Sequence, residues 1–461
     1  MMSCSTSHLS STSPKEITSK PRLVPYNKTF IWGVNGHPVT NLDYVNTSLD
    51  QDLRLLKEHQ FNAYRFDIRT DLDGNVRLHP DRFLVLLQKA QKEGISINPV
   101  LLINEFLDDF KLNLDEAYNR GYRQMKGFAH QYSEFIEYYT LGNEQELRFI
   151  TAGSDGKYMH DYDIEKFKVV AAYLKGMHQG LKEVDPNAKA IINSAGWLHF
   201  GYYDLLQKEE VPYDILGYHW YSKNHTFISD FGEGRIIDIL YERFQKPIWL
   251  TEINAKRGSY DSEISQSELM QTYIKSLHQQ RHVEAFFVYE LYDQPYLIHQ
   301  DWAGPKEANF GIVKWKKAPY QYEYKPISKV LRFGIEEANH GYEDYIYALF
   351  SDLKNELPSK ENLAYWVQRL KDLNNSPQIV HEFYEKNDIK RIAQKTPEAM
   401  ISQTYQDLLH RLPLKSEIKF WLKKLEKNPN LDIRKSIIVS QDYWDESIWE
   451  GYERRTGFDR P

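Results

Sequence analysis

The chain carries an acidic residue directly after an apolar, β-prone run at residues 135–144, which are Phe135-Ile136-Glu137-Tyr138-Tyr139-Thr140-Leu141-Gly142-Asn143-Glu144. Aromatic and β-branched residues favour a strand here, and Gly142 favours a turn after it. A second run, Pro247-Ile248-Trp249-Leu250-Thr251-Glu252, ends on a glutamate in the same way. The sequence therefore predicts two buried strands that each deliver a carboxylate at the C-terminal end.

Short apolar runs alternate with longer amphipathic runs from Thr29 to about Glu337, which is typical of repeated βα units around a parallel sheet. Eight runs are predicted strands: Phe30 to Asn35, Ala63 to Ile68, Ser96 to Ile103, Phe135 to Gly142, Ala188 to Ser194, Ile215 to Tyr221, Ile248 to Ile253 and Ala285 to Leu291. Eight strands and their crossovers in about 300 residues predict an α/β fold, a (β/α)8 TIM barrel. The alternative is a doubly wound open sheet, which would favour a Gly-rich first turn that this sequence lacks.

The composition changes after the predicted eighth helix, where strand patterns end and an internal repeat begins. Seven apolar or proline positions recur at an offset of 55 residues: Phe350, Leu353, Pro358, Leu363, Tyr365, Trp366 and Leu370 match Tyr405, Leu408, Pro413, Ile418, Phe420, Trp421 and Leu425. We predict a small all-α domain at residues 339–461, with repeats at about 345–395 and 400–446. It follows a barrel at 28–338 and a disordered polar leader at 1–27. Trp366 and Trp421 are predicted to be buried core residues.

The composition of the chain limits which kinds of binding partner, cellular location and cofactor we expect. The chain has 461 residues and a net charge of −7, and its Lys and Arg residues are scattered, which argues against a nucleic-acid surface. The single Cys4 excludes a disulfide within one chain. The leader lacks the apolar core of a secretory signal and no run has the length of a membrane span, so the default location is the cytoplasm, with non-classical release as the alternative. We find no Walker loop and no Cys/His cluster, and expect neither cofactor nor metal.

Two carboxylates at one barrel mouth fit the cleavage of a glycosidic bond. One carboxyl group donates a proton to the glycosidic oxygen, and the other attacks or stabilises the anomeric carbon. Counting strands places Glu144 at the end of the fourth strand and Glu252 at the end of the seventh. A similar dipeptide, Asn104-Glu105, follows the third strand, where Glu105 either borders the cleft or lies in a solvated loop.

An Asn-Glu on strand four and a Glu on strand seven resemble the signature of clan A glycoside hydrolases, and residues 29–335 are most similar to families 39 and 5. The resemblance implies a retaining mechanism with Glu144 as acid/base and Glu252 as nucleophile. Arg65 stands where family 5 members place an arginine beside the nucleophile. The run Asn35-Gly36-His37 resembles the Asn-x-His with which family 39 relatives contact sugar hydroxyls.

His219 and Tyr221 resemble the His-x-Tyr of the clan, whose tyrosine hydroxyl bonds the nucleophile and whose histidine lines the site. Tyr289 is predicted to replace the tryptophan that the clan often has on strand eight. The predicted substrate-binding residues are Asn35, His37, Arg65, Asn143, His219, Tyr221, Tyr289, Trp32 and Trp197.

The tail stretch from Tyr405 to Pro413, followed by Phe420-Trp421-Leu422, resembles a bacterial domain of unknown function, numbered 4214, of which residues 342–446 would hold two copies. The tail is expected to bind a protein or polymer partner and to take no part in the chemistry.

The predicted function is thus a retaining β-glycoside hydrolase acting on an oligosaccharide or polysaccharide. Two alternatives stay open: a catalytically silent barrel that binds glycans or scaffolds an assembly, and an enzyme of polysaccharide assembly that trims or transfers glycan chains. The sugar, the linkage and endo or exo action depend on loop shapes.

Overall fold

The computed structural model describes residues 30–460, apart from 231, 233, 278, 302, 318–320, 374–377 and 387–395. The predicted leader and the end of the first predicted repeat lie outside this part of the chain. Within it, no helix combines the length and the apolar character that a membrane span requires.

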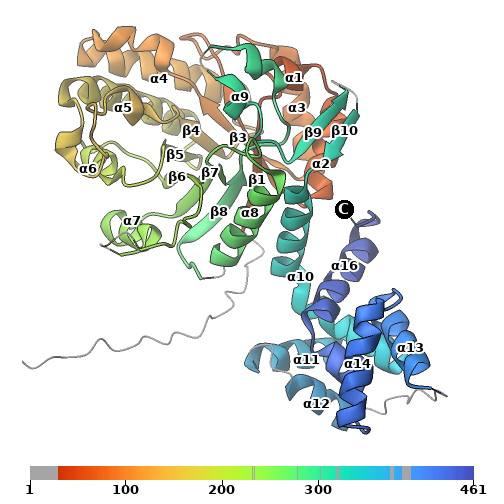
Figure 1. The fold of residues 1–461 in the computed structure, drawn as a ribbon. Coiled ribbons are helices and arrows are strands. Elements are labelled where there is room, and N and C mark those ends of the chain that lie inside the picture. Colours follow the sequence, from red (N-terminus) through yellow and green to blue (C-terminus); the bar gives the residue numbers. More distant parts are fainter. Residues whose placement is uncertain are drawn as a thin grey trace, which may run out of the picture.

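Eight parallel strands close into a barrel in chain order, and β8 pairs with β1 (Figure 1). The strands are β1 Ile31–Gly36, β2 Ala63–Ile68, β3 Ser96–Leu101, β4 Tyr138–Leu141, β5 Lys189–Ser194, β6 Ile215–Ser222, β7 Ile248–Ala255 and β8 Val283–Val288. A hairpin of β9 Val313–Lys317 and β10 Gln321–Tyr324 follows. The predicted (β/α)8 barrel is confirmed.

Helices surround the barrel, and several of them begin after a polar residue that caps the N-terminus. Ser48, Asn113 and Asp163 each accept a hydrogen bond from a backbone N–H of the helix that they precede. The helices of this part are α1 Leu42–Val45, α2 Leu49–Glu58, α3 Pro80–Glu93, α4 Leu114–Tyr132, α5 Ile164–Val184, α6 Phe200–Lys208, α7 Ile236–Phe244, α8 Glu263–Leu277, α9 Gly304–Glu307 and α10 Pro326–Lys354.

The barrel interior is filled by a small apolar cluster that includes Ile191, Trp249 and Phe287. Gly33 makes room for it, because a Cβ at this position would lie 2.2 Å from the ring of Phe287. Polar side chains occupy the strand ends above this cluster. The apolar layer closes the barrel below, so that the site opens at the C-terminal ends of the strands.

Three predicted strands extend two or three residues too far, and the eighth ends at Val288 and not at Leu291. The fourth begins at Tyr138, because the N–H of Phe135 donates to the carbonyl of Tyr132 in a turn that ends α4. The third ends at Leu101, and residues Asn104–Phe106 form a 3-10 helix. Glu105 in that helix is exposed and pairs with Arg77 at 2.9 Å, so it is a solvated loop residue.

The C-terminal part is helical and has its own apolar core, as predicted. Its helices are α11 Lys360–Asp372, α12 Gln378–Lys386, α13 Pro397–Leu409, α14 Lys415–Lys427, α15 Ile433–Ile438 and α16 Gln441–Thr456. The barrel core ends on α10 at Ile335, and the tail core begins on the same helix at Tyr345. The predicted boundary at 338/339 therefore falls where the cores separate, but α10 continues across it without a break (Figure 1).

The offset of 55 residues is visible in the backbone. Asn355 after α10 and His410 after α13 both adopt the left-handed conformation that ends a helix. Trp366 and Trp421 are 3 % and 7 % exposed, which confirms that both are core residues. The indole Nε1 of Trp421 donates to the hydroxyl of Tyr405 at 2.9 Å.

Candidate active site

Glu144 is held at the barrel mouth by a tight turn after β4. Gly142 has a φ of 75° and Glu144 a φ of 45°, which is the left-handed region that a non-glycine residue enters only at a cost. The backbone N–H of Glu144 donates to Oδ1 of Asn193 on β5 at 2.8 Å. The sequence Leu-Gly-Asn-Glu thus ends the strand and turns the carboxylate, whose side chain is 26 % exposed, toward the mouth.

Glu252 reaches the mouth through an irregularity in β7. Leu250 pairs with Tyr218 and Glu252 with His219, so that β7 holds one more residue than β6 at Thr251. Trp249 faces the barrel interior, and strict alternation would turn Glu252 away from it. The extra residue corrects the direction of the side chain, as bulges beside active sites do.

The carboxylate of Glu252 is 11 % exposed and accepts two short hydrogen bonds. Nη1 of Arg65 lies 2.7 Å from Oε1, and the hydroxyl of Tyr221 lies 2.7 Å from Oε2. Burial by itself would raise the pKa of Glu252, but His219, Arg65 and these hydrogen bonds together lower the pKa below its ordinary value. Glu252 is therefore held as a carboxylate.

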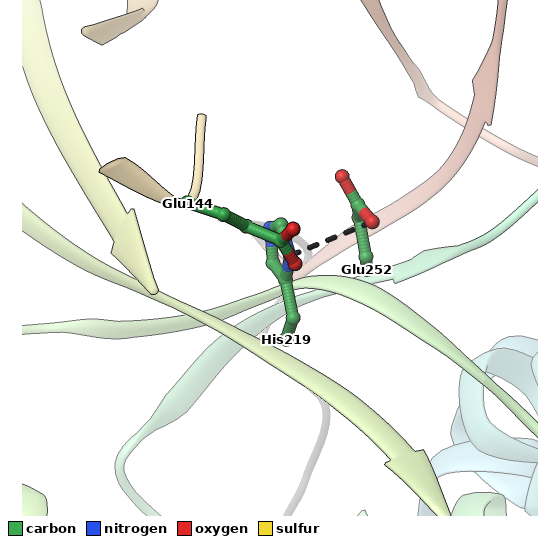
Figure 2. A group of neighbouring side chains, drawn as sticks. All are labelled: Glu144, His219 and Glu252. Atoms are coloured by element: carbon green, nitrogen blue, oxygen red, sulfur yellow. Dashed lines mark hydrogen bonds and ion pairs between the residues drawn. The ribbon is translucent and has the colours of Figure 1, made fainter. Parts of the chain in front are cut away.

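His219 joins the two carboxylates (Figure 2). Its Nδ1 lies 2.7 Å from Oε1 of Glu144 and 3.4 Å from Oε2 of Glu252. One oxygen of Glu144, Nδ1 of His219 and one oxygen of Glu252 all lie within 4.8 Å of one another. These are also donor atoms of the kind that bind divalent metals, but the guanidinium of Arg65 beside Glu252 opposes a second cation.

Arg65 forms hydrogen bonds with several polar side chains at the barrel mouth besides Glu252. Its Nη1 also donates to Oδ1 of Asn35 at 2.7 Å, and its Nη2 donates to Oδ1 of Asn143 at 2.9 Å. Nδ2 of Asn193 donates to the same oxygen of Asn143 at 3.1 Å. With its oxygen fixed by two donors, the amide of Asn143 has one orientation, in which its NH2 group remains available as a donor.

His37, predicted to contact sugar hydroxyls, lies between two carboxylates. Its Nδ1 is 2.6 Å from Asp67, and its Nε2 is 3.5 Å from Glu290 and 3.3 Å from the hydroxyl of Tyr289. Burial would lower the pKa of His37, but Asp67, and then Glu290 and Glu252, raise it to about 9. The imidazole is therefore a cation at neutral pH.

Glu290 is fully buried two residues after the end of β8, and burial raises its pKa to about 7. Tyr44 donates to it at 2.8 Å and Gln294 donates at 2.6 Å. The rings of Tyr289 and Tyr221 stand edge to face, 6.0 Å apart. Tyr289 thus lies between Tyr221, whose hydroxyl donates to Glu252, and His37, which is consistent with its predicted place in the mouth.

One predicted substrate contact is wrong. Trp32 is 1 % exposed and packs against Phe30 and Phe286 in the core outside the barrel. On β1, Gly33 and Asn35 face inward, so Trp32 faces the helices because side chains alternate along a strand.

Trp197 lies in the loop between β5 and α6, where its ring is 5.3 Å from that of Trp220. Its predicted contact with substrate stays a prediction.

Sequence reasoning missed three polar residues of the mouth: Asn193, Asp67 and Glu290. Each carried a signal. Asn193 follows an apolar run on a predicted strand, Asp67 lies two residues after Arg65 and so on the same strand face, and Glu290 follows Tyr289.

A comparison with protein-family models matches part of the barrel. Residues 169–302, which hold His219, Tyr221, Glu252 and Tyr289, match the family model of the glycosyl hydrolase catalytic core. A comparison with curated proteins found no match.

The fold is also found in solved structures. It resembles the β-glucosidase from Thermotoga maritima in complex with galacto-hydroximolactam, with a TM-score of 0.50 and 14% identity over 68% of this chain and 99% of that one. The complex of the same enzyme with deoxynojirimycin gives the same identity and coverage, with a TM-score of 0.49. At this identity the likeness concerns the fold. The match to the catalytic core, together with the closed barrel, supports a glycoside hydrolase.

Proposed function

We propose that this protein is a retaining β-glycoside hydrolase that acts on an oligosaccharide or polysaccharide. The observation that carries the proposal is the approach of the Glu144 and Glu252 carboxylates to within 4.8 Å. Retaining enzymes hold their carboxyl groups about 5 to 5.5 Å apart, whereas inverting enzymes need about 6.5 to 9.5 Å to admit a water molecule.

The environments of the two glutamates suit different steps. Glu252, buried and held ionised by Arg65 and Tyr221, attacks the anomeric carbon as the bond to the leaving oxygen breaks. Glu144, which is more exposed, gives its proton to that oxygen. It then takes a proton from the water that attacks the anomeric carbon and releases Glu252.

The remaining polar groups fit the sugar ring. The NH2 group of Asn143, the imidazolium of His37 and the carboxylate of Asp67 offer both donors and acceptors beside Glu252. Such mixed groups distinguish hydroxyl positions, because a buried donor or acceptor left without a partner costs free energy.

The test uses aryl β-glycosides and follows the anomeric configuration of the first product by NMR. We expect retention. Glu252→Gln should fold normally and lose turnover by at least about a thousandfold. A 2-deoxy-2-fluoro glycoside should label Glu252 covalently. Inversion, or full turnover by a folded Glu252→Gln protein, would reject the mechanism.

The glycosyl group bound to Glu252 would also allow a transferase function, which the same assay can detect. A glycosyl group on Glu252 can pass to a glycan acceptor in place of water, as in an enzyme of polysaccharide assembly. Longer products in the presence of acceptor oligosaccharides would favour that function. A folded protein that neither turns over nor is labelled by any glycoside would favour a silent glycan-binding barrel. Membership of family 39 or 5 stays a prediction.

A further inference from the structure

Helix α14 in the tail carries an unusual charge pattern. Lys415, Lys419, Lys423 and Lys427 follow one another at intervals of four residues, and all are exposed. Residues four apart lie on one face of a helix, so the four ammonium groups form a stripe about 18 Å long. None of them forms an ion pair with a described residue, whereas the neighbouring Arg411 pairs with Glu417 at 2.8 Å.

Folding of the repeat does not require this stripe. The same positions of α11, 55 residues earlier, are occupied by Lys360, Ala364, Gln368 and Asp372. Helix α11 nevertheless forms, and its Trp366 is buried as Trp421 is in α14. The lysines are thus an addition to one copy of a shared framework. Four like charges held together repel one another, and a polyanion along the stripe would remove that repulsion.

A pocket of about 340 Å³ lies beside the stripe. Its lining includes the rings of Tyr405, Phe420 and Trp421 and the polar side chains of Ser416, Ser440 and Asp442. Phe420 is 52 % exposed, although a phenyl ring of this size is usually buried. Tyr405 and Trp421 form the buried base of the pocket, so its exposed ring is that of Phe420, with Lys424 Nζ 4.7 Å from the ring centre. An apolar ring edge beside serine hydroxyls and a carboxylate suits a sugar unit, since its C–H faces are apolar and its edges are polar.

We propose that α14 and this pocket bind an anionic polysaccharide, with its acidic groups on the lysine stripe and one sugar unit in the pocket. That this polymer is also the substrate of the barrel rests on the proposed function. Charge complementarity selects the occupant: a neutral glycan would leave the lysines unused. A duplex nucleic acid fits less well, because its bases are stacked inside the double helix and cannot enter the pocket without being unstacked, whereas one unit of a single glycan chain can enter it.

The test measures binding of the full chain to polygalacturonate, alginate and hyaluronan, with fully methyl-esterified polygalacturonate as the uncharged match. We expect binding to at least one acidic polymer, weakened by salt, and none to the ester. Replacing Lys415, Lys419 and Lys423 together by Gln should weaken binding at least tenfold, while replacement by Arg should preserve it. Gln at the exposed barrel residues Lys92, Lys189 and Lys208 is the matched control.

Phe420→Ala tests whether the pocket contributes to binding, beyond the general attraction between the lysines and an acidic polymer. It keeps every lysine and should weaken binding to polygalacturonate about threefold or more. The proposal is overturned if no acidic polysaccharide binds, if the Gln variant binds as the wild type does, if Phe420→Ala has no effect, or if a DNA duplex binds as tightly as the polysaccharide. Turnover of a small neutral aryl glycoside is measured separately. Its absence with binding retained would reject the hydrolase, and its presence without binding would reject the tail site.

Discussion

At the scale of single residues, the partners of Glu252 set the acid limit of the proposed reaction. A carboxyl group whose pKa is lowered on folding stabilises the protein above its unfolded pKa, and this contribution is lost as the pH falls through the folded pKa. The same ionisation is needed for attack on the anomeric carbon. The acid limb of kcat/KM should therefore lie below the ordinary glutamate value of 4.5.

Arg65→Met tests this dependence. Without the guanidinium 2.7 Å away, burial of Glu252 is opposed by His219 and Tyr221 alone, and the acid limb should rise by about one to two pH units. Arg65→Lys keeps the charge and should restore most of the shift. The control is Arg77→Met, because Arg77 pairs with the exposed Glu105. An acid limb that does not move in a folded Arg65→Met protein would contradict the assignment.

The chain provides a matched pair for the proton donor, since Asn143-Glu144 and Asn104-Glu105 share a dipeptide and differ in place. Glu144→Ala should slow cleavage of substrates with poor leaving groups far more than that of activated ones, and azide should restore turnover. Glu105→Ala should leave kcat unchanged. Steady-state kinetics on two aryl glycosides of different leaving-group pKa decide between them. If Glu105→Ala instead loses activity and azide restores it, the proton donor is Glu105 and the assignment of this role to Glu144 is wrong.

At the scale of elements, the sequence predicted all eight strands, because periodicity and turn residues are local, but it missed several of their ends by two or three residues. The same local signals predicted that Glu144 follows the fourth strand and that Glu252 belongs to the seventh, although Glu252 lies inside β7 and not at its end. The error at Trp32 came from the same source, since an apolar run on a barrel strand does not show which face meets the helices. The bulge at Thr251 was also invisible, because it depends on how β7 pairs with both neighbours.

The His37 cluster shows what a local pattern cannot predict. His37, Asp67 and Glu290 come from β1, β2 and β8 or the residues directly after them, and 30 residues separate His37 from Asp67 while 252 separate it from Tyr289. Only the closure of the barrel brings them together. The periodic repeat of the tail was predictable because both copies stand in one sequence at a fixed offset.

Trp421→Ala tests the tail as a structural element. The indole is buried, and its Nε1 bonds Tyr405, so truncation leaves a cavity and a hydroxyl that has lost its donor. We expect a loss of about 3 to 5 kcal/mol in the stability of the tail, as in other large-to-small core changes. Denaturant unfolding followed by fluorescence measures it. Trp366→Ala in the other repeat is the matched comparison, and a loss below about 1 kcal/mol for both would refute the shared core.

At the scale of the whole molecule, α10 and α16 join the tail to the barrel. Helix α16 returns along α10, where Arg455 pairs with Asp344 at 2.5 Å and also with Glu336. The hydroxyl of Tyr452 donates to the carbonyl of Glu58 on α2. The tail is thus docked on the outer helices, away from the C-terminal strand ends that form the mouth.

Truncation after Ala338 tests whether the tail affects only the stability of the barrel or also its proposed catalytic activity. The shortened chain keeps Ile327, Leu331 and Ile335 of α10, which belong to the barrel core, and all eight strands. It loses the contacts of α16, so its Tm should fall, but the carboxylates and their partners remain. Turnover of a small aryl glycoside should therefore stay within about tenfold of the full chain, or about 1.4 kcal/mol of barrier. A chain that ends at Ser440 removes α16, which also supplies Tyr443 to the tail core, so its change in Tm is an upper bound on the part that comes from docking. If the Ala338 truncation folds and its turnover drops by more than tenfold, the tail helps to shape the active site, and the division of this chain into a catalytic barrel and a binding tail is wrong.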